Sequence, residues 1–228
     1  MPLLQRLSDS RSLRARYAVL LPAIVVAFVL QGVGSTGKVE QVVVSAVLAI
    51  TLMLALWAAD ARRSVMWLAS IVSCLVVLTS VISSIAGHID SGATRLANLL
   101  LVTLAPPAIV LGIVRNLRAR NRVTVEAVFG VLCLYILLGM AFAFIYGALD
   151  RITGTPFFAQ NVRATEANAL YYSVTTLTTI GYGDLTAASN LGHTLSVSEG
   201  LLGQIYLVTV VSLIVGNLGR TRQQPGAD

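Results

Sequence analysis

The stretch 171–184 holds the residues of this sequence whose types and spacing suit the binding of a bare cation. Near its end, Gly181 and Gly183 lie on either side of Tyr182. A cation that sheds its water needs an oxygen in place of each lost water, and stacked backbone carbonyls supply such oxygens. Carbonyls of an extended chain alternate in direction, so turning them to one side needs unusual dihedral angles, which glycine adopts without a Cβ penalty. The stretch therefore predicts a carbonyl-lined cation site, with the Thr179 hydroxyl as a further oxygen at its inner end.

The same stretch resembles the T-x-x-T-x-G-Y-G signature of potassium channels, and the matching residues are Thr176, Thr179, Gly181, Tyr182 and Gly183. The selectivity filter that the resemblance implies comprises Thr179, Ile180, Gly181, Tyr182 and Gly183. By the resemblance, K⁺ would be bound by the carbonyls of the first four and by the Thr179 hydroxyl. Tyr182 would point away from the ion pathway, pack against a short pore helix and set the width of the filter.

The resemblance also implies an outer mouth. Asp184 would raise the local concentration of cations there, and either Tyr171 or Tyr172 stands where some members of the family brace this aspartate with an aromatic residue. Two positions depart from the family. Thr175 replaces a glutamate of certain bacterial channels, and Ala187 lies where a proline is common, so inactivation behaviour cannot be carried over.

The segment Glu166–Thr178 is too short to cross a bilayer, and backbone at membrane depth must be enclosed by protein. We therefore expect a re-entrant pore helix here. The resemblance extends over about 124–218, as an outer helix, pore helix and inner helix. Gly203 lies twenty residues after Gly183, where the family has a hinge glycine. Close packing against another helix is the equally weighted alternative. Glu199 is expected to face protein or water, as ionisable groups within a span usually do.

Composition places these elements in a membrane. Of the 228 residues, 56% are hydrophobic and 11% charged, and the mean hydropathy is +0.82, whereas soluble domains carry about 25% charged residues. Six apolar stretches are long enough to span, the first marginally. They run over Tyr17–Val33, Val39–Ala59, Val65–Ala86, Leu96–Val114, Val123–Leu149 and Thr194–Leu218. The fold class predicted is an all-α membrane protein with six transmembrane helices, a re-entrant pore helix and a tetrameric pore.

The basic residues set the expected orientation, because cytoplasmic loops are enriched in arginine and lysine. With both termini cytoplasmic, 12 basic residues lie inside and 4 outside, the latter being Lys38, Arg95, Arg151 and Arg163. The expected regions are a cytoplasmic segment 1–16, a four-helix membrane domain 17–122, a pore domain 123–219 and a short cytoplasmic tail 220–228. A bacterial inner membrane is the expected location. The net charge of +6 does not indicate nucleic acid, since the arginines gather at helix ends.

The fourth stretch lacks the pattern of a voltage sensor. It contains no basic residue between Leu96 and Val114, and Pro106-Pro107 should kink it. Weak voltage dependence is therefore expected. The cluster Arg115, Arg118, Arg120 and Arg122 is placed in the following linker, where it would contact anionic lipid headgroups or serve as ordinary positive-inside residues.

Other classes of function fit less well. The sequence has no phosphate loop, metal-ligand cluster or nucleophile–base pair, so neither an enzyme nor a cofactor is expected, apart from permeant K⁺ in the filter. Cys74 and Cys133 are expected to be buried free thiols. A ring of carbonyls needs four filter strands and this chain offers one, which predicts a homotetramer. The alternatives are a potassium-uptake subunit, a non-conducting regulatory or adaptor subunit, and a weakly selective cation channel.

Overall fold

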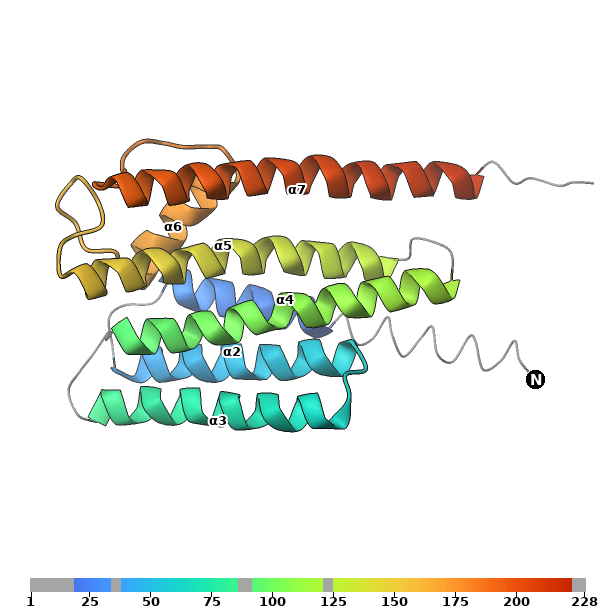
Figure 1. Cartoon of the computed structure of the whole chain (residues 1–228), viewed down its shortest axis with the longest axis horizontal. Coiled ribbons are helices and arrows are strands. Elements are labelled where there is room, and N and C mark those ends of the chain that lie inside the picture. The colour runs from blue at the N-terminus through green and yellow to red at the C-terminus, as the bar shows by residue number, and fades with distance from the viewer. Residues whose placement is uncertain (1–18, 34–37, 86–91, 121–124, 223–228) are drawn as a thin grey trace, which may run out of the picture.

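The structure is a computed structural model that describes residues 19–33, 38–85, 92–120 and 125–222. Within these ranges the chain is helical, and the described residues hold no β-structure beyond one antiparallel bridge between Phe158 and Ala187. The helices in chain order (Figure 1) are Val19–Val33, α2 (Lys38–Ala58), α3 (Arg63–Ile85), α4 (Gly92–Arg120), α5 (Val125–Thr153), α6 (Glu166–Leu177) and α7 (Asn190–Arg222). The predicted all-α class is confirmed for this part of the chain.

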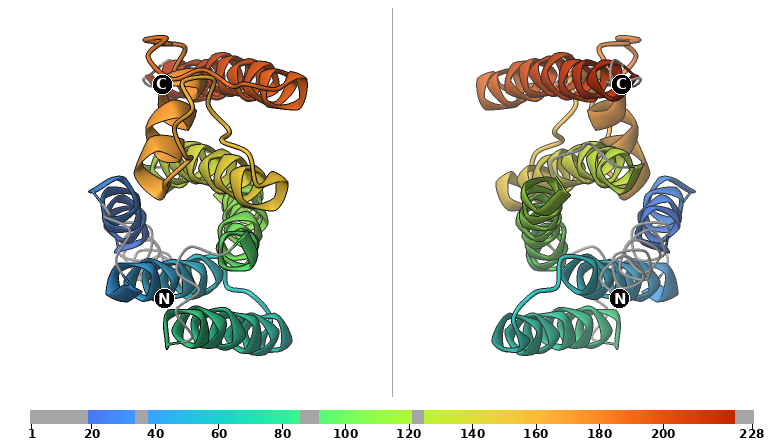
Figure 2. Two further views of the ribbon diagram at one scale, coloured as in Figure 1. Left: turned by 90° about the vertical axis from the view of Figure 1, so that its left-hand side faces the viewer. Right: turned by 90° about the vertical axis from the view of Figure 1, so that its right-hand side faces the viewer.

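The long helices lie along the longest axis of the molecule, and the short helix α6 lies at one end (Figure 1). Viewed along that axis, α3 and α7 are on opposite sides, with α4 and α5 between them (Figure 2). α4 packs along α5, α2 packs against α3 and α4, and α6 packs against α5 and α7. Longer helices therefore cover α6 on two sides, as a half-length helix at membrane depth requires.

Among the described residues, four helices are long and apolar enough to cross a membrane, and they lie within α2, α3, α4 and α5. They correspond to the second to fifth of the predicted spans. The helix Val19–Val33 has fewer than 18 residues, so at about 1.5 Å per residue it is shorter than a ~30 Å hydrocarbon core. α7 has 33 residues and is therefore about 50 Å long, but its described part is not among the four candidate spans. Six spans remain a prediction.

The arginines at the two ends of α4 belong to a helix that is longer than the predicted apolar stretch. The expected linker is helical as far as Arg120, so Arg115, Arg118 and Arg120 lie on the α4 backbone, while Arg122 lies outside the described residues. Arg95, which is predicted to lie on the outer side of the membrane, is in the first turn of α4 and is buried, and its side of the membrane stays a prediction. The reason is that hydropathy marks the apolar part of a helix, whereas leucine, alanine and arginine continue the helix itself through their high helix propensity.

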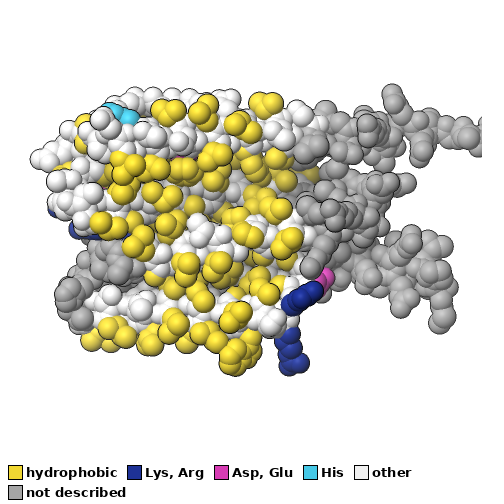
Figure 3. All heavy atoms as spheres, viewed as in Figure 1, with side chains coloured by type: hydrophobic (Ala, Val, Ile, Leu, Met, Phe, Trp, Pro, Cys, Tyr) yellow, Lys and Arg dark blue, Asp and Glu magenta, His cyan; other side chains and the backbone are white. Residues whose placement is uncertain are grey.

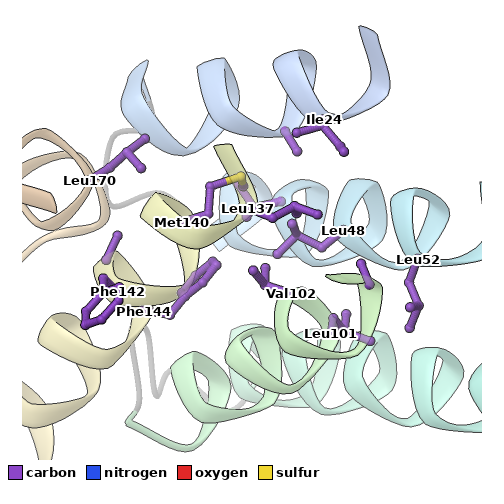
Figure 4. Close-up of a cluster of buried hydrophobic side chains, with 14 of the residues drawn as sticks. Ile24, Leu48, Leu52, Leu101, Val102, Leu137, Met140, Phe142, Phe144 and Leu170 are labelled. Atoms are coloured by element: carbon purple, nitrogen blue, oxygen red, sulfur yellow. The ribbon is translucent and has the colours of Figure 1, made fainter. Parts of the chain in front are cut away.

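One hydrophobic core joins the helices before α5, which we call the peripheral helices (Val19–Val33, α2, α3 and α4), to α5 (Figure 4). Ile24 of the first helix, Leu48 of α2 and Leu101 of α4 lie in one buried cluster with Leu137 and Met140 of α5. Many of the surrounding buried residues are alanines, which let helix backbones approach closely. Close packing matters here because lipid tails are as apolar as the side chains, so burial alone does not drive helices together in a membrane. The helices before α5 thus share one core with α5 of the same chain.

A buried polar cluster adds hydrogen bonds between α2, α3 and α4. The Ser45 hydroxyl lies 2.8 Å from the Ser80 hydroxyl and donates to Asn98 Oδ1 at 2.8 Å. Interhelical hydrogen bonds of this kind contribute about 0.6 kcal/mol each in membrane proteins. They supply directionality that apolar contacts lack.

Apolar side chains cover the outside of the bundle, as Trp67 and Leu75 illustrate. Figure 3 shows such side chains spread over the face of the molecule, with basic side chains at both ends. A continuous surface of this kind suits lipid rather than water. Cys74 lies on this exposed surface, so the prediction of two buried thiols is wrong for Cys74 and confirmed for Cys133; both cysteines are free. The error arises because an apolar span has faces toward lipid as well as toward protein.

Candidate functional site

The short helix α6 begins and ends at residues that satisfy its free backbone groups. The Thr165 side chain accepts a hydrogen bond from the Asn168 backbone N–H at the N-terminus, as an N-cap does. At the other end, the Thr178 hydroxyl donates to the Val174 carbonyl at 2.6 Å. The helix stops there, and the backbone then enters a different conformation at Thr179.

The segment 179–183 has backbone dihedrals that alternate in sign. Thr179, Gly181 and Gly183 have φ of +59°, +52° and +80°, whereas Ile180 and Tyr182 are not among the residues with positive φ. The left-handed region costs little for glycine, but for a β-branched residue such as Thr179 it is a rare and strained conformation. Strain of this kind persists only where the surroundings enforce it, and it gathers at functional sites.

Two hydrogen bonds to α6 hold this segment in place. The Thr179 N–H donates to the Thr176 carbonyl at 3.0 Å, and the Gly181 N–H donates to the Thr175 carbonyl at 3.1 Å. The Thr175 hydroxyl donates to the Tyr172 carbonyl of its own helix. Thr175, which departs from the family pattern, therefore acts on the segment through its backbone. Any shift of the end of α6 would move Gly181 with it.

The C-terminal end of the segment contacts one of the two candidate tyrosines. The Tyr171 hydroxyl donates to Asp184 Oδ2 at 2.9 Å, and the Tyr171 and Tyr182 rings are stacked, with centroids 6.3 Å apart and planes at 3°. Desolvation, together with the hydrogen bond to Asp184 and the charge of Asp184, raises the pKa of the Tyr171 hydroxyl, so it remains a donor at neutral pH. Tyr172 does not brace Asp184, because its hydroxyl pairs with Ser196 of α7 at 2.7 Å.

Behind α6, an aromatic cluster fastens the connection between α5 and α6. The rings of Phe157 and Phe158 contact Tyr172, and Tyr146 of α5 contacts both Phe157 and Tyr172. The same connection pairs with the chain beyond Asp184, since the Ala188 N–H donates to the Phe157 carbonyl at 2.9 Å. The segment 179–183 is thus held at one end by α6 and at the other by the connection between α5 and α6. Together with α5 and α7, these elements form one packed unit.

A buried carboxyl group links the three helices of this unit. Glu199 of α7 is fully buried (0% exposed). It accepts a hydrogen bond from the Tyr146 hydroxyl of α5 at 2.6 Å, and it contacts the Ser173 hydroxyl of α6. Ser173 also lies 2.7 Å from the Gly139 carbonyl of α5. Glu199 therefore faces protein, which is one of the two surroundings expected from the sequence.

A second buried carboxylate, that of Asp150, lies at the end of α5 and organises the chain that leads into α6. Its side chain accepts from the backbone N–H of Phe157 at 2.8 Å and of Ala164 at 3.1 Å. It also forms an ion pair with Arg163 at 3.2 Å. Charge-assisted hydrogen bonds of this type are about twice as strong as neutral ones. Asp150 thereby fixes where α6 begins.

The N-terminal end of the segment contacts α7. The Gln204 amide donates to the Thr179 hydroxyl oxygen at 3.3 Å, a contact that sequence reasoning left undecided. At Gly203, an added Cβ would overlap the Leu177 carbonyl oxygen and lie 2.9 Å from Leu177 Cδ1. Glycine is therefore required for α7 to pack against the end of α6. This favours the close-packing interpretation of Gly203, and the hinge stays a prediction.

Replacing Gly203 with alanine is expected to destabilise the protein by about 1–3 kcal/mol, the usual cost of overfilling a packed interface. Thermal unfolding of the purified protein in detergent would measure this loss. Gly200→Ala is the matched control on the same helix, because a Cβ there comes no closer than 3.7 Å to the Thr176 carbonyl oxygen. Equal melting temperatures for the two variants would contradict the packing role of Gly203.

Sequence reasoning missed several residues of this arrangement. Asp150, Tyr146 and Ser173 were not singled out, although a carboxylate near the end of an apolar stretch was a signal available for Asp150. Arg95 was assigned only a side of the membrane, and its contact with Ala164 was not predicted. Of the residues that were named, Thr176 and Thr179 lie together at the end of α6.

A comparison with protein-family models matched residues 130–219 to a family described as "Ion channel". The match takes in most of α5, all of α6 and most of α7, and it supports an ion-channel family for this part of the chain. Together with the apolar helices, it indicates a membrane protein with a role in ion transport, which is not an enzymatic activity. Searches of curated proteins and of solved structures found no match.

Proposed function

We propose that this chain is a subunit of a potassium-selective channel that conducts K⁺ passively across the membrane. The observation that carries the proposal is the alternation of positive φ at Thr179, Gly181 and Gly183. An extended strand in which every second residue is left-handed turns successive carbonyls toward the same side. Rings of such carbonyls are what replaces the water of K⁺ in a selectivity filter. In this proposal the segment 179–183 is the filter and K⁺ is its substrate.

The exposed surface of the filter unit supports a homotetramer. Ile180 and Tyr182 are 54% and 70% exposed, and α7 presents Val197, Leu201 and Ile205 outward. Apolar groups beside a filter are poor neighbours for a hydrated ion but suit contact with another copy of the chain. Four copies around one axis would complete the carbonyl rings, with α7 as the inner helix, α5 as the outer helix and α6 as the pore helix.

The proposed topology has six spans with both termini in the cytoplasm, in a bacterial inner membrane. The first and last spans would be the predicted stretch Tyr17–Val33, of which the structure describes the part from Val19 onward, and the apolar part of α7. The cytoplasmic end of α4 carries Arg115, Arg118 and Arg120 on its backbone, within reach of anionic headgroups at that surface. Since the apolar stretch of α4 contains no basic residue between Leu96 and Val114, little charge would move through the field, and conduction should depend weakly on voltage.

Two further functions remain as alternatives. A non-conducting regulatory or adaptor subunit would keep the fold but give no flux of its own, and would alter the current of a partner. A weakly selective cation channel would conduct Na⁺ as well as K⁺. Both glycines of the filter and Thr179 are present, and the strained φ of Thr179 would be an unneeded cost in a protein that no longer binds ions.

Ion flux into liposomes that contain the purified protein tests the proposal. We expect flux driven by a K⁺ gradient, blocked by Ba²⁺, and at least about tenfold smaller for a matched Na⁺ gradient, a difference of ~1.4 kcal/mol in barrier height. Equal K⁺ and Na⁺ flux would favour the weakly selective channel. Absence of flux for both ions, with current restored or altered in a partner channel, would favour the regulatory subunit.

A further inference from the structure

Arg95 has surroundings that neither a surface arginine nor a voltage-sensing charge would have. It lies in the first turn of α4, within the peripheral region 17–122, and is 1% exposed. Its Nη1 donates to the Ala164 carbonyl at 2.6 Å. Ala164 belongs to the connection between α5 and α6 and directly precedes Thr165, the N-cap of α6. A buried guanidinium of the peripheral helices therefore reaches the start of the pore helix.

The peptide groups of Ala164 are held from two sides. Its carbonyl accepts from Arg95 of α4, and its N–H donates to Asp150 of α5 at 3.1 Å. Ala164 itself is fully buried. Two charged groups from different helices thus fix the position of one residue immediately before α6. Since each bond involves a charge, each is among the stronger hydrogen bonds in proteins.

Gly147 of α5 provides the passage for Arg95. A Cβ at Gly147 would overlap the Arg95 guanidinium and lie 3.1 Å from Arg95 Cδ. The arginine therefore crosses α5 in the space that the missing side chain leaves. Gly147 and Arg95 form a matched pair, since any side chain at position 147 would push the guanidinium away from Ala164.

We propose that Arg95 is a positioning residue through which the peripheral helices hold the pore helix, so that these helices control whether the filter conducts. The conduction part of this inference rests on the proposed channel function. The contacts form a continuous route. Arg95 donates to the Ala164 carbonyl, and Ala164 directly precedes the N-cap of α6. At the other end of α6, the Thr175 carbonyl accepts the hydrogen bond from the Gly181 N–H. Movement of α4 would thereby shift the filter without any charge crossing the membrane.

Hydrogen exchange of the full-length protein in liposomes tests the positioning role without reference to conduction. The readout is exchange of the backbone amides over 157–170, measured for Arg95→Met, Arg95→Lys, Gly147→Ala and the double variant Arg95→Met/Gly147→Ala. Arg95→Met removes the charged hydrogen bond at the Ala164 carbonyl. The local structure that keeps the Ala164 N–H bonded to Asp150 should then open more often, so exchange of this N–H should speed up about tenfold or more. Arg95→Lys should fall between it and the unsubstituted protein.

The double variant separates a shared role from two independent ones. Gly147→Ala alone should raise the exchange rate of the Ala164 N–H about tenfold. In the Arg95→Met background it should add less than about threefold, because the guanidinium that the alanine would displace is already absent. Gly32→Ala is the matched control, since a Cβ there meets only a Leu170 methyl at 3.5 Å. Independent effects of the two substitutions, or unchanged exchange in Arg95→Met, would overturn the positioning role.

Flux in the same liposomes tests the conduction part. We expect Arg95→Met and Gly147→Ala to lower the ratio of K⁺ to Na⁺ flux at least about threefold, with partial recovery in Arg95→Lys. A merely structural role would lower the melting temperature and leave this ratio unchanged, which would overturn the link to the filter. If the unsubstituted protein carries no flux, the channel proposal and the link to conduction both fail, while exchange still decides whether Arg95 positions α6.

Discussion

Replacing Gly181 with alanine should reduce K⁺ flux by at least about 100-fold. Gly181 has φ of +52°, where a residue with a Cβ costs about 1–2 kcal/mol. One substitution in the chain is four in the proposed tetramer, so the cost is about 4–8 kcal/mol, concentrated in a few residues around one axis. The filter would relax to negative φ at this position, and its carbonyls would no longer face the same side.

A steric clash within the single chain does not explain this effect, because no atom lies within 4 Å of a Cβ built at Gly181. The cause is the backbone conformation, and a matched control can isolate it. Gly154 has φ of +70° and equally open surroundings, but it lies in the connection between α5 and α6. Gly154→Ala should keep flux within about threefold of the unsubstituted protein. Flux of Gly181→Ala at the level of Gly154→Ala would show that the segment 179–183 is not the filter.

Replacing Glu199 with alanine should destabilise the protein by roughly 2–4 kcal/mol per chain, whereas Glu199→Gln should change stability by less than about 1 kcal/mol. The difference follows from counting protons. The Ser173 hydroxyl carries one proton but contacts two acceptors, the Gly139 carbonyl and the Glu199 carboxyl. Both contacts can be hydrogen bonds at once only if the carboxyl group carries a proton of its own.

A neutral carboxyl group and a glutamine amide have nearly the same shape, and both place an acceptor oxygen beside a donor group, although the amide carries two N–H where the carboxyl group carries one O–H. The amide oxygen would accept from Tyr146, and the amide nitrogen would donate to Ser173. Alanine would leave both hydroxyl groups without this partner and open a cavity between α5, α6 and α7. Thermal unfolding in detergent, followed by flux measurements on the folded variants, would test both substitutions. If Glu199→Gln were as unstable as Glu199→Ala, the carboxyl group would have to be charged.

The sequence by itself determined the features that depend on local chemistry. A short helix was predicted over Glu166–Thr178 because this segment between apolar stretches is too brief to span, and the structure has it over Glu166–Leu177. The turn conformations at Gly181 and Gly183 follow from the absence of a Cβ. Four of the six predicted spans follow from runs of apolar residues. In each case the information lies within a few neighbouring residues.

Only the tertiary structure decided which side chains meet. Arg95, Asp150 and Glu199 are buried because of the helices that surround them. The hydroxyl groups of Tyr171 and Tyr172, adjacent in sequence, have different partners because they lie on different faces of α6. Membrane helices that are apolar all round carry little periodicity to tell a protein-facing side from a lipid-facing one. The contacts between helices therefore had to come from the fold.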